Sequence, residues 1–288
     1  MLTHLSELIA DAKHSGYALG AFNVDNLETT VGVVRAAVQK KSPLIIQISE
    51  RTIKYGGLKT MTAMIETMVR DEAGNIPIAL HLDHGRSFRS IAECIAAGFS
   101  SIMVDNSDVP FKENVILTRQ SVEYAHKKDV WVQGELGVVK GLEEATPEDR
   151  EKFMTDPDEA KQFVDETEVD TLAVAVGNVH GIVKLKKGLP QLNLERLEQI
   201  HKAIPEVPLV LHGASGLQTD QVKATFEHGI VIVNLNTELK LEYSNSLRDT
   251  LIGHPEYFDI RDILTPPTDA LQRVVEEKLM LFGSANRI

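Results

Sequence analysis

The chain has 288 residues and a formal net charge of -12 at pH 7, with 30 Lys and Arg against 42 Asp and Glu. This acidic balance lacks the basic surface that nucleic acid requires, and no apolar run reaches the roughly 20 residues that span a bilayer, so neither partner is expected. The N-terminus has no basic start followed by an apolar core, and the single cysteine, Cys94, excludes an intrachain disulfide. We therefore expect a cytoplasmic protein.

Eight short apolar segments rich in β-branched residues follow one another along the chain. Most are separated by stretches in which apolar residues return every three or four positions, as in amphipathic helices. Alternating strands and helices of this number predict an α/β fold, a (β/α)8 TIM barrel in a single domain. An open doubly wound sheet is the alternative, but "GAFNVDN" does not match the dinucleotide fingerprint G-x-G-x-x-G. The predicted strands span residues 18–24, 43–49, 77–83, 101–105, 130–136, 171–178, 208–213 and 230–236.

Two segments do not fit the eightfold repeat. Residues from about 137 to 157 are polar and charged and lie in the longest gap between predicted strands, which is typical of a lid loop. Residues from about 251 to 288 follow the last predicted strand and end in an amphipathic helix. We expect them to form a C-terminal helical extension of the barrel.

Polar side chains end nearly every predicted strand. Since barrel enzymes build their sites at the carboxyl ends of the strands, these side chains should converge in space. Three of them, His84, His180 and His212, would supply three neutral imidazoles around one face, which is how a catalytic Zn²⁺ is held. The full set of strand-end residues is His81, Asp83, His84, Asp105, Glu135, Asn178, His180, His212, Asn234, Asn236 and Thr237.

Glycines follow two of the proposed ligands, in "VHG" at 179–181 and in "HGASG" at 212–216. Such loops let backbone N–H groups turn toward an anion, and the last two strands of a barrel often bind phosphate. Ser215, Asn234, Thr237 and Lys184 add polar donors to the same rim. A phosphorylated ligand is therefore expected there.

The sequence resembles the class II, zinc-dependent ketose-bisphosphate aldolases over essentially its whole length. The matching motifs are "GAFNVDNLE", "HLDHG", "SIMVD", "GELG" followed by "GLEE", "GNVHG", "VLHGASG", "VNLNTELK" and "FDIRDIL". The resemblance implies that His84, His180 and His212 hold one zinc ion per subunit, which stabilises negative charge on the ketone oxygen. It also implies that Asp83 is the acid/base at the hydroxyl whose deprotonation starts carbon–carbon cleavage.

Further roles follow from the same resemblance. Glu143 of the lid loop, with Glu144 as the fallback, would exchange a proton on the dihydroxyacetone phosphate half of the substrate. Asp105 and Glu135 would lie near the metal, behind its ligands or as alternative ligands. The residues implied to bind substrate are Asn23, Ser49, Gly181, Lys184, Gly213, Ala214, Ser215, Asn234, Asn236, Thr237 and Arg261, and the backbone of Val179, Gly181 and Gly213 would hold a monovalent cation, Na⁺ or K⁺.

The implied substrate is a phosphorylated sugar, first of all fructose 1,6-bisphosphate, cleaved reversibly to dihydroxyacetone phosphate and glyceraldehyde 3-phosphate. Tagatose 1,6-bisphosphate, a phosphorylated deoxy-keto acid and a sulfonated ketose 1-phosphate are alternatives, and a non-catalytic sugar-phosphate-binding barrel is a remote one. Gln133, Lys140 and Val183 depart from the family pattern without touching the proposed zinc ligands. A homodimer or homotetramer is implied, in which Arg261 reaches the distal anion in a neighbouring site.

Overall fold

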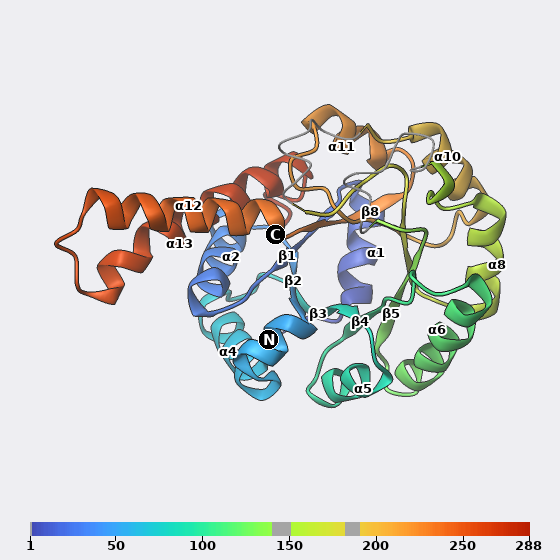
Figure 1. Ribbon diagram of the computed structural model, residues 1–288, viewed down its shortest axis with the longest axis horizontal. Helices are drawn as coiled ribbons and strands as arrows, with labels where there is room; N and C mark the ends of the chain where they lie inside the picture. The colour runs from blue at the N-terminus through green and yellow to red at the C-terminus, as the bar shows by residue number, and fades with distance from the viewer. Residues whose placement is uncertain (1, 140–150, 182–190) are drawn as a thin grey trace.

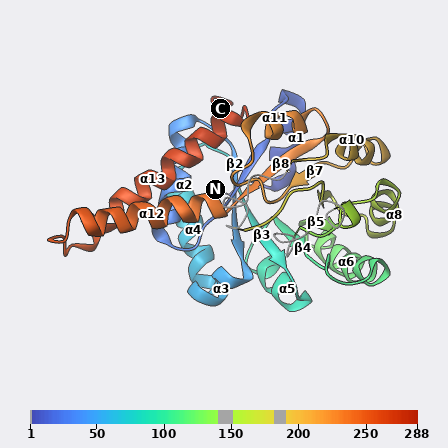
Figure 2. The ribbon, with the colours of Figure 1, turned by 45° about the horizontal axis from the view of Figure 1, so that its top comes forward.

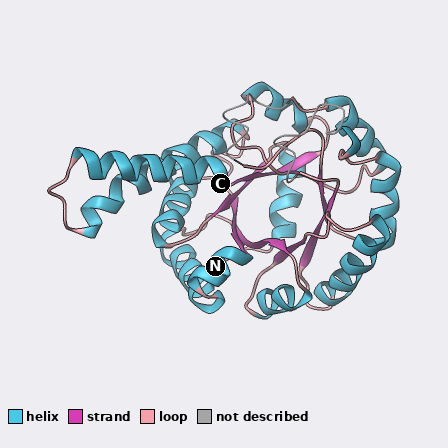
Figure 3. Cartoon of the chain, viewed as in Figure 1, coloured by secondary structure: helices cyan, strands magenta, loops and turns pink. Residues whose placement is uncertain are grey.

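Eight parallel strands close into a barrel at the centre of the protein, in a computed structural model that describes residues 2–139, 151–181 and 191–288 (Figures 1 and 3). Neighbours in the barrel are neighbours in the sequence, and β1 closes the circle by pairing with β8. The predicted (β/α)8 barrel is confirmed. The strands are β1 (Leu19–Asn23), β2 (Leu44–Ser49), β3 (Ile78–Gly85), β4 (Ser101–Val104), β5 (Trp131–Leu136), β6 (Thr171–Val174), β7 (Leu209–Leu211) and β8 (Ile230–Leu235).

Helices surround the barrel, as Figure 3 shows. Their inward faces pack on the outward-facing Val, Leu and Ile side chains of the strands, which forms the larger apolar core. Cys94 lies in this core, where burial first and nearby Glu50 and Glu93 second raise the pKa of its thiol to about 12. The helices are α1 (Leu5–Ser15), α2 (Leu27–Lys40), α3 (Glu50–Gly56), α4 (Leu58–Glu72), α5 (Phe88–Ala96), α6 (Phe111–His126), α8 (Pro157–Thr167), α10 (Leu194–Ala203), α11 (Thr219–Phe226), α12 (Thr237–Gly253) and α13 (Ile260–Leu281).

The inside of the barrel is apolar at one end and polar at the other. At the amino-terminal end, Leu19, Ile45 and Ile232 pack against Leu5 and Ile9 of α1, which closes the bottom of the barrel. Toward the carboxyl ends of the strands, polar residues occupy the buried interior positions. Alternation along each strand directs their side chains into the barrel. These buried polar residues are Asn23, Gln47, His81, Asp83, Gln133, Glu135, His212 and Asn234.

Strand β3 departs from regular alternation where it matters for the site. The pairing of β3 with β4 shifts register between Leu82 and Gly85, and His84 adopts a φ of 53°. A positive φ is energetically unfavourable for a residue with a side chain. The backbone is therefore strained at His84, where the side chain turns away from the alternating pattern. A Cβ on Gly85 would lie 2.7 Å from the carbonyl oxygen of Met103, which explains the glycine after this bulge.

Helices α12 and α13 lie side by side and project from the barrel as a helical arm (Figures 1 and 2). The arm is tied to the barrel through α2, where Thr268 and Leu271 of α13 approach Gly32. At its tip, Ile252 and Phe258 are 79% and 92% exposed. No helix in the described ranges is long and apolar enough to cross a membrane.

Candidate active site

A cavity of about 450 Å³ opens at the carboxyl ends of the strands. It gathers residues from β1, β2, β3 and β8, from the starts of α3 and α12, and from the loops that follow β3, β6, β7 and β8, although these segments are far apart in the sequence. Twelve of the residues expected from the sequence line it, namely Asn23, Ser49, Asp83, His84, His180, Gly181, His212, Gly213, Ser215, Asn234, Asn236 and Thr237.

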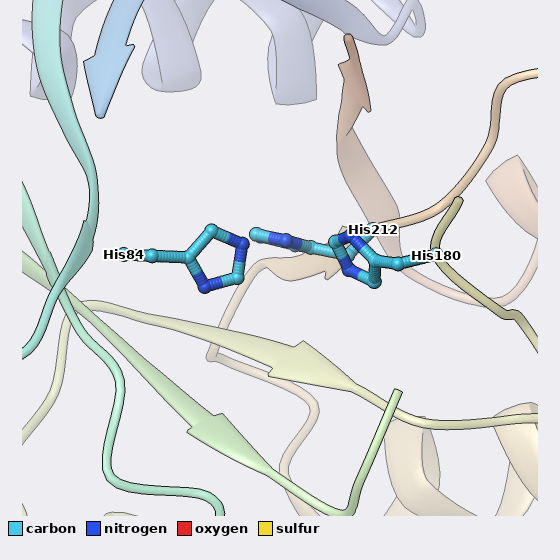
Figure 4. Close-up of side chains that lie close together, drawn as sticks. All are labelled: His84, His180 and His212. Carbon is cyan, nitrogen blue, oxygen red and sulfur yellow. The ribbon is translucent and has the colours of Figure 1, made fainter. Parts of the chain in front are cut away.

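Three histidines converge in this cavity (Figure 4). The ring of His84 lies 5.5 Å from that of His180 and 5.0 Å from that of His212, measured between centroids, and the third separation is 5.7 Å. One ring nitrogen of each lies within 4.8 Å of the other two. Three imidazoles in this arrangement match the donor set of a catalytic zinc site that keeps a position open for substrate.

Carboxylates support His84 from behind. Its Nδ1 is hydrogen-bonded to Asp105 Oδ2 at 2.7 Å and lies 3.8 Å from Glu135 Oε2. Burial alone would lower the pKa of His84, but Asp83, Asp105 and Glu135 outweigh it and raise the pKa to about 9. A histidine whose Nδ1 is held by a carboxylate presents Nε2 in a fixed direction, as metal-binding histidines commonly do.

His212 is held in a different environment, by amide side chains. Its Nε2 is hydrogen-bonded to the side-chain amides of Gln133, at 2.8 Å, and Asn234, at 3.0 Å. Burial and then the positive charge of His84 lower the pKa of His212 well below its ordinary value. The imidazole is therefore neutral, which is the form that binds a metal.

Asp83 lies beside His84 and is buried, with its Oδ1 3.7 Å from His84 Nε2. Asn23 Nδ2 donates a hydrogen bond to Asp83 Oδ2 at 2.8 Å, and Gln47 Nε2 in turn donates to Asn23 Oδ1 at 2.7 Å. Burial raises the pKa of Asp83, but the combined effect of His84, His212 and the Asn23 bond is larger, and the pKa falls below its ordinary value. Asp83 is therefore an ionised base next to the histidine cluster.

His81 lies two residues before Asp83 on β3 and has a supporting role. Its Nδ1 is hydrogen-bonded to Ser101 at 2.7 Å, and burial lowers its pKa to about 4. A neutral, buried histidine of this kind packs the barrel interior and is not exposed to a ligand.

The described part of the rim formed after β6 and β7 offers backbone N–H and side-chain hydroxyl groups. Gly181 and Gly213 have φ of 102° and 61°, and a Cβ on Gly213 would lie 2.7 Å from the carbonyl oxygen of Val179. Both glycines are therefore required by the backbone. Ser215 is buried next to them and Thr237 begins α12, so hydroxyl and N–H groups converge at this rim.

Other residues expected from the sequence lie elsewhere. Ala214 is buried beside the rim, and Asp105 and Glu135 lie behind His84. Arg261 lies on the arm, 88% exposed, where its Nη2 is 2.6 Å from Asp259 Oδ2. Lys140, Glu143, Glu144, Val183 and Lys184 lie outside the described residues.

Four cavity residues were not anticipated from the sequence: Gln47, Glu50, Arg51 and Arg86. Gln47 could have been noticed as the one amide within the apolar run "LIIQIS". Arg86, two residues after His84, donates to Asp105 Oδ2 at 2.9 Å and so fixes the carboxylate that holds His84. Nothing in the local pattern around Arg51 marks it as a cavity residue.

The geometry agrees with comparisons to known proteins. Residues 3–287 match the family described as fructose-bisphosphate aldolase class-II. This chain belongs to the class II fructose-bisphosphate aldolase family. The aldolase is 40% identical over 287 residues to a probable fructose-bisphosphate aldolase of Bacillus subtilis, with 99% of each chain covered, and 39% identical over 287 residues to a fructose-bisphosphate aldolase of Staphylococcus aureus, again with 99% coverage.

Solved structures show the same architecture. The crystal structure of the YdjI aldolase of Escherichia coli superposes with a TM-score of 0.86 at 32% identity, covering 100% of this chain and 99% of that one. The resemblance to the family stated from the sequence motifs is thus confirmed, and the protein is a carbon–carbon lyase of the aldolase type. Enzymes of this class use a metal, and the histidine cluster is where the aldolase has the donors to bind one.

Proposed function

We propose that the aldolase reversibly cleaves fructose 1,6-bisphosphate to dihydroxyacetone phosphate and glyceraldehyde 3-phosphate, with one zinc ion per subunit. The observation that carries this proposal is the convergence of His84, His180 and His212 beside the ionised Asp83, in one cavity. The names of the aldolase's relatives support fructose bisphosphate as the substrate.

The donor set favours zinc over the harder divalent cations. Three imidazole nitrogens suit Zn²⁺, whereas Mg²⁺ and Ca²⁺ prefer oxygen ligands. When bound, the metal supplies Lewis-acid stabilisation of the negative charge that develops on the ketone oxygen during cleavage. Asp105 would hold the His84 ring in place, and Glu135 would remain close enough to serve as an alternative ligand.

The chain's own side chains carry the proton transfers in this proposal. Asp83 takes the proton from the substrate hydroxyl next to the bond that breaks, and the hydrogen bond from Asn23 Nδ2 keeps the carboxylate ionised and oriented. Glu143 then protonates the carbon of the dihydroxyacetone phosphate half. The rim at Gly181, Gly213 and Ser215 binds the C1 phosphate, together with Lys184, Ala214, Asn234, Asn236 and Thr237.

Assembly completes the proposal. We propose a homodimer or homotetramer, in which Arg261 leaves Asp259 and reaches the distal phosphate in a neighbouring subunit. The exposed Ile252 and Phe258 at the tip of the arm support contact with a second copy.

We further propose that backbone groups of Val179, Gly181 and Gly213 hold Na⁺ or K⁺, and that the aldolase works in the cytoplasm.

The test is a turnover assay with a panel of ketose phosphates. Fructose 1,6-bisphosphate should be cleaved with the highest kcat/KM, above tagatose 1,6-bisphosphate, a phosphorylated deoxy-keto acid and a sulfonated ketose 1-phosphate. A preference for another member of the panel would change the substrate and leave the reaction type intact. Binding without turnover of any member would show a sugar-phosphate-binding barrel that is not an enzyme.

A further inference from the structure

We infer that Arg51 binds the distal anionic group of the ketose phosphate, within the same subunit that holds the three histidines. The inference rests on the proposed function and deepens it. It names a residue of the same subunit that, in addition to Arg261 from a neighbouring subunit, recognises the end of the substrate remote from the C1 phosphate.

The position of Arg51 is the first argument. The active-site cavity of about 450 Å³ has a neighbour of about 440 Å³ between α3 and α12, here called the side pocket, and Asn23 and Arg51 line both. Asn23 is the residue that bonds to Asp83. Arg51 therefore lies where the active-site cavity and the side pocket adjoin, on the same side of the cavity as Asn23.

The second argument is the order of the strands. Arg51 follows β2 directly, in the first turn of α3, whereas the rim proposed for the C1 phosphate follows β6 and β7. In the closed barrel β8 and β1 separate β7 from β2. A ketose with its C1 phosphate at Gly213 and its reacting carbons at Asp83 must extend its remaining carbons away from the rim. Arg51 lines the cavity on the β2 side.

Charge provides the third argument. Among the described residues, the lysines and arginines that line the two cavities are Arg51, Arg86 and Lys240. Arg86 Nη2 is 2.9 Å from Asp105, and Lys240 Nζ is 3.0 Å from Asp25. The guanidinium of Arg51 makes no hydrogen bond or ion pair with any residue in the described ranges, so it is the cation left without a counter-charge.

The acidic residues nearest to Arg51 in sequence and in the side pocket are already engaged. Glu50 accepts hydrogen bonds from the backbone N–H of Arg86, at 2.9 Å, and from the hydroxyl of Ser90. Asp25 accepts a hydrogen bond from Thr52 at 2.6 Å in addition to its ion pair with Lys240. In a chain of net charge -12, an unneutralised arginine at the mouth of a cavity gives an anion a local partner, and its planar fork can bind phosphate oxygens through two parallel bonds.

The experiment compares two substrates that differ only in the distal phosphate, fructose 1,6-bisphosphate and fructose 1-phosphate. Arg51→Gln removes the charge and keeps a shorter polar side chain. Arg89→Gln is the matched control, because it removes an exposed arginine that pairs with Glu93 on α5, outside both cavities. We expect Arg51→Gln to lower kcat/KM for the bisphosphate by about 10- to 100-fold and to change that for fructose 1-phosphate by less than about 2-fold. Arg89→Gln should leave both near wild-type values.

Several outcomes would overturn the inference. An equal loss on both substrates would show that Arg51 supports the β2–α3 turn instead of contacting the distal group, and unchanged turnover of the bisphosphate would show that it makes no such contact. If the wild-type enzyme cleaves only fructose 1-phosphate, its substrate has no distal anion for Arg51 to bind. If the wild-type enzyme cleaves neither sugar, or cleaves only fructose 1-phosphate, the proposed function fails and the inference fails with it. An equal loss on both substrates, or unchanged turnover of the bisphosphate, in Arg51→Gln overturns the inference alone and leaves the proposed function standing.

Discussion

Replacing Asn23 by alanine tests how the structure keeps Asp83 ready to act as a base. The substitution removes the bond from Asn23 Nδ2 to Asp83 Oδ2, at 2.8 Å, and the bond that Asn23 Oδ1 accepts from Gln47, at 2.7 Å. A hydrogen bond to a charged group contributes about 1.5–3 kcal/mol and a neutral one about 0.5–1.5 kcal/mol, so the free energy of unfolding should fall by about 2–4 kcal/mol. Loss of the charged bond also raises the pKa of Asp83, because the hydrogen bond from Asn23 favours the ionised carboxylate.

The assay measures kcat/KM for cleavage of fructose 1,6-bisphosphate and, separately, proton exchange on dihydroxyacetone phosphate. Cleavage should fall by about 10- to 100-fold, because about 1.5–3 kcal/mol of support for the ionised base is gone, whereas exchange, assigned to Glu143, should change little. Ser42→Ala is the control, since it breaks a buried 2.9 Å bond to Ser284 at the other end of the barrel and should reduce stability without affecting turnover. Wild-type cleavage in Asn23→Ala, or an equal loss of exchange, would refute this account of Asp83.

Three further expectations follow. Asp83→Asn should lose cleavage by about 10²- to 10⁴-fold while retaining zinc and proton exchange, and Glu143→Gln should lose the exchange; loss of zinc from Asp83→Asn would show that Asp83 is a ligand. His81 has a pKa of about 4 in the folded chain, below the ordinary 6.5, so the unfolded chain binds the extra proton and stability should fall as pH falls from 6.5 toward 4. In metal-free protein this contributes about 2 kcal/mol between pH 6.5 and 5, seen as a steeper pH dependence of urea unfolding than in His81→Asn, and equal slopes would contradict it. Thr155→Val should destabilise the protein by about 2–4 kcal/mol in urea, because Thr155 Oγ1 donates to the carbonyl of Leu136 at 2.5 Å and accepts from the N–H of Ala175 at 2.9 Å; a change below about 0.5 kcal/mol would mean that these groups find other partners.

The barrel could be predicted from the sequence because its strands are short apolar runs rich in β-branched residues, which recur along the chain. The ends of the strands were harder to predict. Residues 172–176 are all apolar, yet β6 ends at Val174. The Asn178 side chain bonds the backbone at Val174 and Val176, and Gly177 takes a φ of 96°. Side-chain bonds to the backbone and positive φ leave little trace in an apolar pattern.

The candidate site was predictable to the extent that it depends on strand ends. His84, His180 and His212 were placed together by the barrel geometry alone, and the structure brings them together. What alternation could not give is the bulge at His84, which depends on a register shift between β3 and β4. The chain of amides from Gln47 to Asn23 to Asp83 also joins three separate strands, so its bonds exist only in the folded chain.

Arg51 and Arg261 show why charged side chains are the least predictable part of the site. Arg261 carries the family motif but pairs with Asp259 on the arm within one chain, and its proposed role requires a second copy. Arg51 has no motif, and its importance emerges only when the ion pairs of Arg86 and Lys240 are known. A long side chain with several rotatable bonds takes its partner from the folded surroundings, which local sequence does not encode.

Zinc dependence of cleavage tests the central claim most directly. The aldolase is treated with a chelator, freed of the chelate, and assayed for cleavage of fructose 1,6-bisphosphate while Zn²⁺ is added back. The account predicts that cleavage is lost in the metal-free protein and returns in full with one equivalent of Zn²⁺ per subunit, and that His180→Ala binds zinc weakly and stays inactive. Full cleavage in metal-free protein would contradict it.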